Sequence, residues 1–450
     1  MGKPSIPKGT RDFLPKQMAG RNYIFDTVKA IFKNYGFLQI ETPAVENLST
    51  LTGKYGEEGD QLMFKILNRG DKFKKAVSNH SEKETDFAEL ALKYDQTVPF
   101  ARFVVQNQNE ITFPFKRYQI QPVWRADRPG KGRYREFYQC DVDVVGSDSL
   151  LCEVEFIQIY NEVLSALKIS DYTIKVNNRK ILYGIAETVG EQEKIIDITV
   201  AIDKLEKIGL EKVNEELASK GVSKDAIDKL QSIIQLKGSS HEKLSILKKF
   251  LSDSEIGLKG IEELEFVINF INEIDLGDFL ELDVTLARGL NYYTGIIFEV
   301  VCEGFKGSIC GGGRYDGLTD QFGLKGISAA GISFGADRIY DILLERNLFP
   351  EDVMQDLQVF FVNFGDKEAK HIIPMLNELR GKNISSEIYP TAAKMRKQMT
   401  YANAKGAGYV VLIGTNEIES GRITVKNMNT GNQEEITFND FLNKLENNET

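Results

Sequence analysis

The stretch from Lys116 to Arg135 contains the residues whose types most clearly suggest chemistry. It holds seven Lys or Arg residues and a single acid, Asp127. An arginine guanidinium presents a fixed fork of donors that suits phosphate oxygens, and it can also stack on a nucleotide base. This basic stretch therefore has two interpretations. It is either a solvated loop or part of a site for a phosphate-bearing ligand.

The residues that follow favour the ligand site. Side chains two apart along a strand share one face of a sheet. One face of the segment 136–145 would then carry an aromatic ring, an amide and two carboxylates, namely Phe137, Gln139, Asp141 and Asp143. The opposite face would be largely apolar, with Tyr138, Cys140, Val142 and Val144. A polar row that ends at an arginine-rich loop suits a ligand with both an anionic and a cationic group.

Histidine and cysteine offer little chemistry in this chain. The three His residues are far apart in the sequence, and the four Cys residues never fall in a CxxC spacing. A zinc site, a Cys/His nucleophile and a disulfide framework are therefore all disfavoured. We expect arginine, carboxylates and backbone to do the work, without a protein-held metal and in a reducing compartment.

Length and composition indicate a multidomain globular protein. At roughly 150 residues per domain, the 450 residues allow about three domains. No apolar run reaches the roughly 18 residues of a membrane helix, and the N-terminus has no apolar stretch of signal-peptide type, so we expect a cytoplasmic protein without a membrane partner. The net charge of −10 argues, at face value, against a nucleic-acid partner.

The elements that must position these residues follow from periodicity. Apolar residues at helical spacing predict a helix over 24–35, which Gly36 would end. Two extended runs within 111–146 predict an antiparallel hairpin with the basic loop at its tip. Strand-like chain resumes near residue 281, and another helix is expected to begin near residue 331.

The chain divides into three pieces. Residues 197–275 repeat apolar positions every 3.6 residues with balanced charge, so they predict an all-helical insertion. The insertion interrupts an α+β body formed by 1–196 and 276–345. After a linker, residues 357–450 alternate strand and helix, which predicts a small α/β domain with a mostly parallel sheet.

Six segments, in order along the chain, resemble the motifs of the histidyl-tRNA synthetase family of class II aminoacyl-tRNA synthetases. They resemble the family's N-terminal signature, motifs 1 and 2, the two histidine signatures and motif 3. The segments are KGTRDFLP (8–15), GFLQIETP (36–43), residues 115–146, LARGLNYYTG (286–295), ICGGGRYDGL (309–318) and GISFGADRI (331–339).

The resemblance implies both a fold and a function. The fold would be a class II antiparallel-sheet catalytic domain with a helical insertion and a C-terminal α/β anticodon-binding domain. The enzyme would be a ligase that activates L-histidine with ATP to histidyl-adenylate and transfers the histidyl group to the 3′ end of tRNA(His). ATP would be a substrate, with Mg²⁺ held mainly by its phosphates. A homodimer is expected, because motif 1 builds the two-fold interface in this class.

The resemblance also assigns roles to residues around ATP. Arg125 would hold the α-phosphate and the substrate carboxylate, and Phe137 would stack on adenine. Arg133 and Arg338 would meet the γ-phosphate from opposite sides. Arg288 would be catalytic, together with Arg125, by stabilising charge at the α-phosphate.

The histidine substrate would be held by polar contacts around its amino group and by a tyrosine-lined imidazole pocket. The implied histidine-binding residues are Asp95, Gln96, Thr97, Arg125, Gln139, Asp143, Arg288, Tyr292 and Tyr293. The chain departs from the family at Gln96, where Leu is usual, and at Asn291, where Asp is common. These two positions leave the finer geometry of the pocket open.

Other parts of the chain are less informative. Residues 79–90 look like an exposed loop, to which we assign no role. Residues 391–408 carry four basic residues and no acid, and the resemblance places them on a tRNA-facing surface. The contacted nucleotides and the contacts of the helical insertion do not follow from the sequence.

Two alternatives remain at this point. A catalytically silent paralogue, acting as a histidine-sensing regulatory subunit of ATP phosphoribosyltransferase, would normally lack the C-terminal domain and the ATP-binding arginines. All four arginines and the C-terminal domain are present here. A class II synthetase for another amino acid would not carry LARGLNYY.

Overall fold

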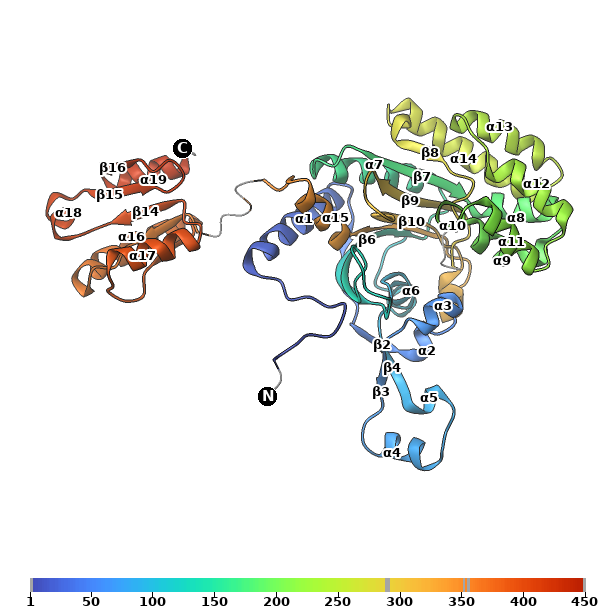
Figure 1. Cartoon of the computed structure of the whole chain (residues 1–450), viewed down its shortest axis with the longest axis horizontal. Helices are drawn as coiled ribbons and strands as arrows, with labels where there is room; N and C mark the ends of the chain where they lie inside the picture. The colour runs from blue at the N-terminus through green and yellow to red at the C-terminus, as the bar shows by residue number, and fades with distance from the viewer. Residues whose placement is uncertain (1–2, 288–291, 351–352, 354–356, 448–450) are drawn as a thin grey trace. The chain divides into compact units, whose positions relative to one another are not determined.

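The computed structural model describes residues 3–287, 292–350, 353 and 357–447. The chain forms two compact units (Figure 1). The first unit comprises Met1–Arg11 and Ile24–Leu348, and the second comprises Asp12–Tyr23 and Phe349–Thr450. Every helix among the described residues is too short or too polar to serve as a membrane span.

The first unit is built on an eight-stranded sheet of order β1-β5-β6-β11-β10-β9-β7-β8. Only the outermost pairs, β1 with β5 and β7 with β8, are parallel, and the remaining pairs are antiparallel. The α+β class with a mostly antiparallel sheet is therefore confirmed. The strands are β1 (Leu38–Gln39), β5 (Phe115–Trp124), β6 (Glu136–Val145), β7 (Tyr172–Asn178), β8 (Leu280–Leu282), β9 (Ile296–Cys302), β10 (Cys310–Arg314) and β11 (Ala329–Gly335).

The predicted hairpin is formed by β5 and β6. Their register runs from Phe115 opposite Val145 to Trp124 opposite Glu136. Residues 125–135, which we call the arginine loop, connect the two strands. Polar residues lie opposite one another along one face, with Gln119 facing Asp141.

The other face of this sheet is apolar and is covered by α7 (Leu151–Ala166) and by the part of α1 (Pro15–Asn34) that belongs to the first unit, from Ile24 onward. The ring centroid of Phe32 lies 5.7 Å from that of Tyr118 and 5.8 Å from that of Phe334. The Tyr160 ring lies 5.2 Å from Phe334. Helix α1 begins nine residues before the predicted start, because Pro15 suits the first turn of a helix whereas the apolar spacing begins only at Ile24.

Short elements frame the open side of the sheet. Three strands form a second sheet of order β2-β4-β3, and α4 and α5 lie at the outer end of β3 and β4 (Figure 1). The expected loop over 79–90 is partly wrong, because it contains α5 and the start of β4. These elements are β2 (Val45–Asn47), α2 (Leu48–Leu51), α3 (Gly56–Gln61), β3 (Lys65–Leu67), α4 (Asp71–Ser78), α5 (Glu84–Phe87), β4 (Ala88–Leu92), α6 (Thr97–Gln106), η3 (Leu318–Phe322) and α15 (Ala336–Glu345).

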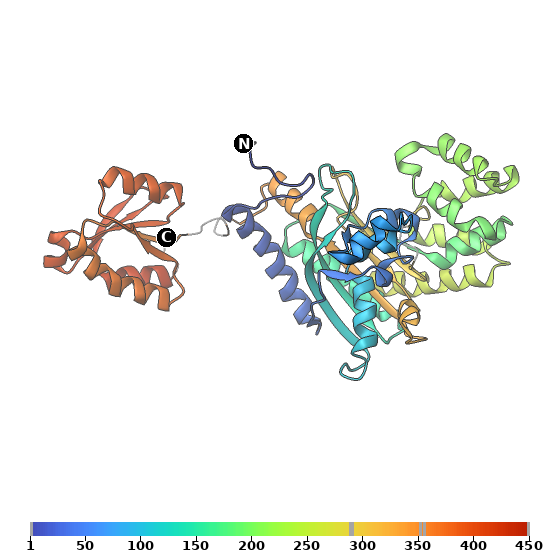
Figure 2. The same ribbon diagram turned by 90° about the horizontal axis from the view of Figure 1, so that it is seen from below.

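A lobe of helices lies to one side of the sheet (Figures 1 and 2). Its helices bury the apolar positions that the 3.6-residue period predicts, such as Leu230 and Ile233 in α12. Ser239 and Glu242 form a capping box at the start of α13. The helices are α8 (Arg179–Thr188), η1 (Gln192–Lys194), α9 (Ile195–Ile202), α10 (Leu205–Ile208), α11 (Leu210–Ser219), α12 (Lys224–Ile234), α13 (Ser240–Phe250), α14 (Glu255–Glu273) and η2 (Gly277–Phe279). The exact limits of this insertion stay a prediction.

The second unit contains a mixed five-stranded sheet of order β13-β12-β14-β15-β16. Strand β12 is parallel to both neighbours, but the β14–β15 and β15–β16 pairs are antiparallel. The expectation of a mostly parallel sheet is wrong, because β15 runs antiparallel to β14 and a turn that includes Gly431 (φ +77°) folds β16 back on β15. The elements are β12 (Val359–Phe361), α16 (Asp366–Gly381), β13 (Ser386–Ile388), α17 (Met395–Ala404), β14 (Tyr409–Leu412), α18 (Thr415–Ser420), β15 (Ile423–Asn427), β16 (Gln433–Ile436) and α19 (Phe438–Glu446).

A buried ion pair fastens the end of β10 to α7. Arg314 donates from Nε and Nη2 to the two carboxylate oxygens of Glu153, at 2.6 and 2.7 Å. Its Nη1 donates to the Ser147 carbonyl at 3.1 Å and to Ser328 Oγ at 2.6 Å. Both charged side chains are almost fully buried, so each neutralises a charge that the interior could not hold alone.

We predict that Glu153→Ala destabilises the first unit by about 3–5 kcal/mol, because the substitution leaves Arg314 buried without its carboxylate. Glu155→Ala is the matched control, since Glu155 lies on the same helix and pairs with Lys116 at 2.7 Å in a half-exposed setting. The control should lose no more than about 1 kcal/mol. Urea denaturation measures both values, and equal losses would contradict the prediction.

Candidate active site

A cavity of about 290 Å³ opens on the polar face of the eight-stranded sheet. Its floor comes from β6, β10 and β11, and its walls come from the arginine loop, the start of α6 and the start of α15. Ten of the predicted site residues line it, although they span almost 250 positions in the sequence. They are Asp95, Thr97, Arg125, Arg133, Phe137, Gln139, Asp143, Tyr292, Tyr293 and Arg338.

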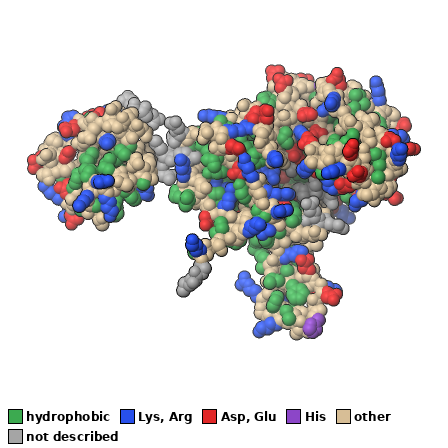
Figure 3. Space-filling view, viewed as in Figure 1, with side chains coloured by type: hydrophobic (Ala, Val, Ile, Leu, Met, Phe, Trp, Pro, Cys, Tyr) green, Lys and Arg blue, Asp and Glu red, His purple; other side chains and the backbone are tan. Residues whose placement is uncertain are grey.

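One end of the cavity is cationic. The Nε of Arg125 donates to the Tyr94 carbonyl at 3.1 Å, and its guanidinium lies 4.4 Å from the Tyr94 ring centroid and 5.3 Å from that of Phe137. Arg133 is half-exposed, and its Nε lies 3.3 Å from Asp127 Oδ2. Figure 3 shows Lys and Arg side chains gathered over the middle of the first unit, whereas the helical lobe shows both signs of charge.

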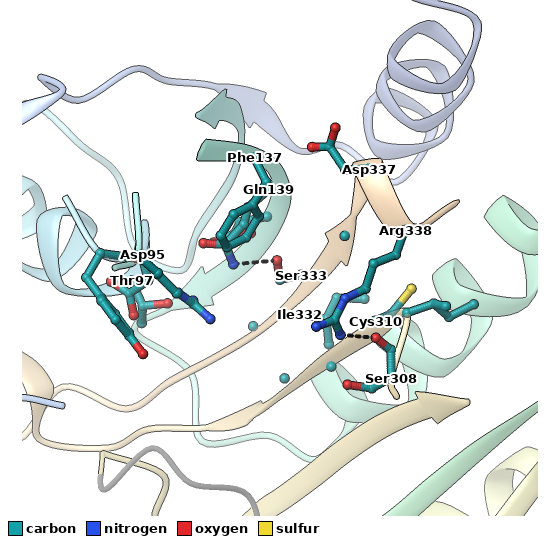
Figure 4. Close-up of a pocket in the computed structure, with 18 of the residues that line it drawn as sticks. Asp95, Thr97, Phe137, Gln139, Ser308, Cys310, Ile332, Ser333, Asp337 and Arg338 are labelled. Atoms are coloured by element: carbon teal, nitrogen blue, oxygen red, sulfur yellow. Dashed lines mark hydrogen bonds between the residues drawn. The ribbon is translucent and has the colours of Figure 1, made fainter. Parts of the chain in front are cut away.

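Arg338 approaches the same end from the opposite wall. Its Nε donates to the Gly132 carbonyl at 2.8 Å, and its Nη1 donates to the Ser308 carbonyl (Figure 4). These two contacts join α15 to the arginine loop and to the segment before β10. The guanidinium is therefore held in place by backbone oxygens on two sides.

The other end of the cavity holds a buried carboxylate, Asp95. Tyr55 donates to its Oδ1 at 2.8 Å, and Tyr292 donates to its Oδ2 at 3.1 Å. The Val98 amide also donates to Oδ1, at 3.2 Å. Burial raises the pKa of Asp95, although the hydrogen bond from Tyr55 and the charge of Arg125 oppose the shift. An anionic Asp95 at this end suits a cationic group of a ligand.

Asp143 sits deeper, on the floor of the cavity. It pairs with the fully buried Arg117, whose Nη2 lies 2.8 Å from its Oδ2, and Tyr315 donates to its Oδ1 at 2.5 Å. The carboxylate lies over Gly331, which faces it across the strand pair. A Cβ at Gly331 would lie 1.9 Å from Asp143 Oδ1, so only glycine allows this placement.

Gln139 projects from the middle of the floor. Its Nε2 donates to Ser333 Oγ at 2.9 Å (Figure 4), and its Oε1 is buried without a partner in the protein. The neighbouring Asp141 also lines the cavity. Burial raises the pKa of Asp141 to about 7, although the charge of Arg117 opposes the shift. The orphaned amide oxygen is an acceptor that a ligand donor would satisfy.

The structure places Gln96 differently from the sequence-based expectation. Gln96 is fully buried and is not among the residues that line the cavity. Its Nε2 donates to the carbonyls of Gln121 and Gln139, both at 2.9 Å. These two residues lie opposite one another in the β5–β6 pair. Gln96 therefore ties two strands together behind the cavity, rather than facing a ligand.

The segment before β9 contains four of the residues singled out from the sequence, Arg288, Asn291, Tyr292 and Tyr293. Arg288 and Asn291 lie outside the described residues. Tyr292 and Tyr293 do line the cavity, and they precede β9 in a loop. Their ring centroids are 4.8 Å apart, and the Tyr292 hydroxyl reaches Asp95.

Several residues of the site were not identified from the sequence. Tyr94 contacts Arg125, Tyr55 and Arg117 hold the carboxylates, and Ser333 orients Gln139. Only Ser333 carried a usable signal, because Phe334 and Ile332 flank it in an alternating strand pattern. Among the residues that the structure describes, no three His, Cys, Asp or Glu side chains are grouped so as to hold a metal ion.

Comparison with known proteins decides what this arrangement belongs to. The family model described as histidyl-tRNA synthetase matches residues 9–339, and the model described as anticodon binding domain matches residues 358–448. The chain belongs to the histidyl-tRNA synthetase family. The predicted family and the predicted fold class, a class II catalytic domain with a C-terminal α/β anticodon-binding domain, are both confirmed.

Relatives within this synthetase family match along nearly the whole chain. The histidine–tRNA ligase of Phocaeicola vulgatus is 57% identical over 447 residues, with 98% of each chain covered. The Bacteroides fragilis ligase is 58% identical over 450 residues and covers 98% of this chain and 99% of its own. A crystal structure of histidyl-tRNA synthetase from a Nostoc species has a TM-score of 0.84 at 31% identity, with both chains fully covered.

The regulatory-subunit alternative is disfavoured by the same comparisons. A Bacillus halodurans structure described as an ATP phosphoribosyltransferase regulatory subunit/histidyl-tRNA synthetase shares the fold, with a TM-score of 0.75 at 20% identity. Similarity at that level concerns the fold alone. The anticodon-binding match over residues 358–448 favours a synthetase over a regulatory paralogue.

We predict that Asp141→Asn weakens the pH dependence of stability. The Asp141 carboxyl has a pKa of about 7 in the folded protein and about 4 in an unfolded chain. A carboxyl whose pKa is raised by folding contributes stability below pH 4 that is lost as the pH rises to 7. Urea denaturation between these pH values should therefore show a shallower decline for the variant. Identical slopes would contradict the prediction.

Proposed function

We propose that this chain is an active histidine–tRNA ligase, in which the cavity joins L-histidine to ATP and then passes the histidyl group to the 3′ end of tRNA(His). The carrying observation is the match to ligases at 57–58% identity over 98% of the chain, including the anticodon-binding domain. The cavity supports it, because a cationic end and a carboxylate-lined end meet over one sheet.

The first step would place ATP at the cationic end. Arg125 would contact the α-phosphate and the histidine carboxylate, and Phe137 would stack on adenine. Arg133 and Arg338 would meet the γ-phosphate from opposite walls. The histidine carboxylate is already ionised at neutral pH, so the displacement at phosphorus needs no general base. It needs alignment and stabilisation of phosphate charge.

Histidine would occupy the carboxylate-lined end. Its ammonium group would satisfy the buried Oε1 of Gln139 and bind Asp95, which Tyr55 and Tyr292 already orient. Its imidazole would lie near Tyr293 and Asp143. A site that hydrogen-bonds a polar substrate rejects analogues without those groups far better than an apolar pocket does. Gln96 would act on this end only through the backbone of Gln139.

Arg288 remains the proposed catalytic residue. The backbone just before it is held by buried side chains, because Asn177 donates to the Leu286 carbonyl at 2.9 Å and Arg179 donates to the Ala287 carbonyl at 2.7 Å. Tyr292, just after it, is tied to Asp95. Both flanks are thus held by buried side chains, and Tyr292 and Asp95 line the cavity, which supports a role for Arg288 at the α-phosphate.

The second unit would bind the anticodon arm of tRNA. Helix α17 and its N-cap expose Lys394, Arg396 and Lys397. Single-stranded bases near such a surface can be stacked and read along their edges. The interaction should weaken steeply with salt, because phosphate binding releases counterions.

Three further parts of the proposal concern partners and location. ATP would enter as its magnesium complex, with the ion held mainly by phosphate oxygens and water. Two chains would form a homodimer through the motif 1 region, and light scattering that returned a monomer would contradict this. The reaction would take place in the cytoplasm.

Histidine-dependent exchange of pyrophosphate into ATP tests the first step. The purified full chain should exchange with L-histidine and not with the other amino acids. Absence of exchange from folded protein would favour the silent regulatory alternative. Exchange with a different amino acid would contradict the substrate assignment.

We predict that Arg288→Ala lowers the maximal exchange rate by about 100-fold or more, as expected when a group that stabilises the transition state is removed. The KM for histidine should change far less, since the contact strengthens only as charge builds at phosphorus. Arg288→Lys should fall between, because it keeps the charge but loses the fork. A rise in the KM for histidine that matched the loss of rate would make Arg288 a binding residue only.

A further inference from the structure

The arginine loop carries an excess of positive charge that its own acid does not neutralise. It carries Arg125, Arg128, Lys131, Arg133 and Arg135 within eleven positions, with Asp127 as the only acid. Like charges at this spacing repel one another, so the loop needs contacts from outside to keep a fixed shape before a polyphosphate arrives.

Helix α15 supplies one set of outside contacts. Its acidic residues Asp337, Asp341 and Glu345 are spaced four apart, so they share one face of the helix. Lys131 lies 2.9 Å from Glu345, and the Tyr134 hydroxyl donates to Asp341 at 2.8 Å. The loop is therefore laid along the acidic face of the helix that carries Arg338.

The N-terminal segment supplies the other set. The Gly9 carbonyl accepts a hydrogen bond from the Arg135 amide at 2.8 Å. Gly9 has a φ of +88°, and a Cβ there would lie 2.8 Å from side-chain atoms of Arg135 and Pro129. The segment thus runs directly against the loop, and it delivers Arg11 two residues later.

Arg11 makes two contacts that matter. Its guanidinium carbon lies 3.4 Å from the ring centroid of Tyr134, and its Nη2 forms an ion pair with Oδ1 of the buried Asp337. The second oxygen of Asp337 accepts the Tyr138 amide at 2.8 Å. One guanidinium therefore joins the arginine loop, the start of β6 and the first turn of α15.

The two residues that Arg11 contacts are each adjacent in sequence to an arginine of the cavity. Tyr134 directly follows Arg133, and Asp337 directly precedes Arg338. Tyr134 and Asp337 both line the cavity, whereas Arg11 does not. We propose that Arg11 is a positioning residue for ATP, because it fixes the separation of the two arginines that clasp the γ-phosphate. This inference rests on the proposed function, and it assigns a task to the N-terminal segment.

The alternative is that Arg11 only tethers the N-terminal segment and contributes stability. The two roles predict different effects on the KM values for ATP and histidine. A tether would change the melting temperature and leave the KM for both substrates alone. A positioning residue would raise the KM for ATP selectively, because histidine binds at the other end of the cavity.

The test compares Arg11→Ala and Arg11→Lys in histidine-dependent pyrophosphate exchange with the full chain. Arg11→Ala should raise the KM for ATP roughly tenfold, which corresponds to losing a stacked cation and its ion pair. The KM for histidine should stay within about twofold. Arg11→Lys keeps the charge beside Asp337 but loses the planar stack on Tyr134, so it should fall between.

Arg102→Ala is the matched control. Arg102 also pairs with a buried carboxylate, Glu46, at 2.6 Å, but it has no contact with the arginine loop among those the structure gives. The control should lower thermal stability without changing the KM for ATP. If Arg11→Ala fails to fold, Arg11→Lys and Tyr134→Leu carry the test, and each should raise the KM for ATP selectively.

A double mutant tests whether Arg11 acts on the KM for ATP through Tyr134. In a Tyr134→Leu background, Arg11→Ala should raise the KM for ATP by clearly less than it does in the wild-type chain, since the stack is already broken and only the ion pair with Asp337 remains to be lost. Additive losses, an equal rise in both KM values, or an unchanged KM for ATP would each overturn the inference. Wild-type protein without any histidine-dependent exchange would instead refute the proposed function.

Discussion

The buried ion pair between Arg117 and Asp143 is the interaction on which the rest of the site depends. Both side chains are almost completely excluded from water, so neither charge would be tolerated alone. The pair fixes Asp143 over Gly331 and leaves Tyr315 to complete its hydrogen bonds. Arg117 also supplies a positive charge that lowers the pKa of Asp141, against the rise that burial causes. The polar floor is stabilised by this arginine, which lies directly opposite Asp143 in the β5–β6 pair and so on the same face of the sheet.

The same floor explains why glycine is required on the neighbouring strands. Gly331 makes room for the Asp143 carboxylate, and a Cβ at Gly312 would lie 2.2 Å from the Gly331 carbonyl. The glycine signatures of this chain therefore serve close packing between β10, β11 and β6. The cationic end of the cavity is built from arginines.

Much of this site could be predicted from the sequence, because it follows from strand periodicity and from motifs. Alternation alone placed Phe137, Gln139 and Asp143 on one face, and the structure puts all three around one cavity. The role of Gln96 could not be predicted in this way. Its position next to Asp95 suggested a ligand contact, but the side chain turns toward the carbonyls of two strands that are distant in sequence. Adjacency in sequence says nothing about which way a side chain turns at the start of a helix.

The other differences between the predictions and the structure also come from contacts between residues that are distant in sequence. The parallel strands β12 and β14 and the antiparallel strand β15 look alike in sequence, because all are short apolar runs, and only the turn at Gly431 marks β15 and β16 as a hairpin. Arg117 was read as one more cation of the basic stretch, although it is buried and paired. The local charge of that stretch is thus smaller at the surface than its composition implies. The cations of that stretch that remain accessible are those of the arginine loop. Asp127 of the loop itself pairs with Arg133, and Glu345 of α15 pairs with Lys131. An acidic protein can therefore present a cationic site for polyanions, because nearby acids fix the geometry of the cations at that site.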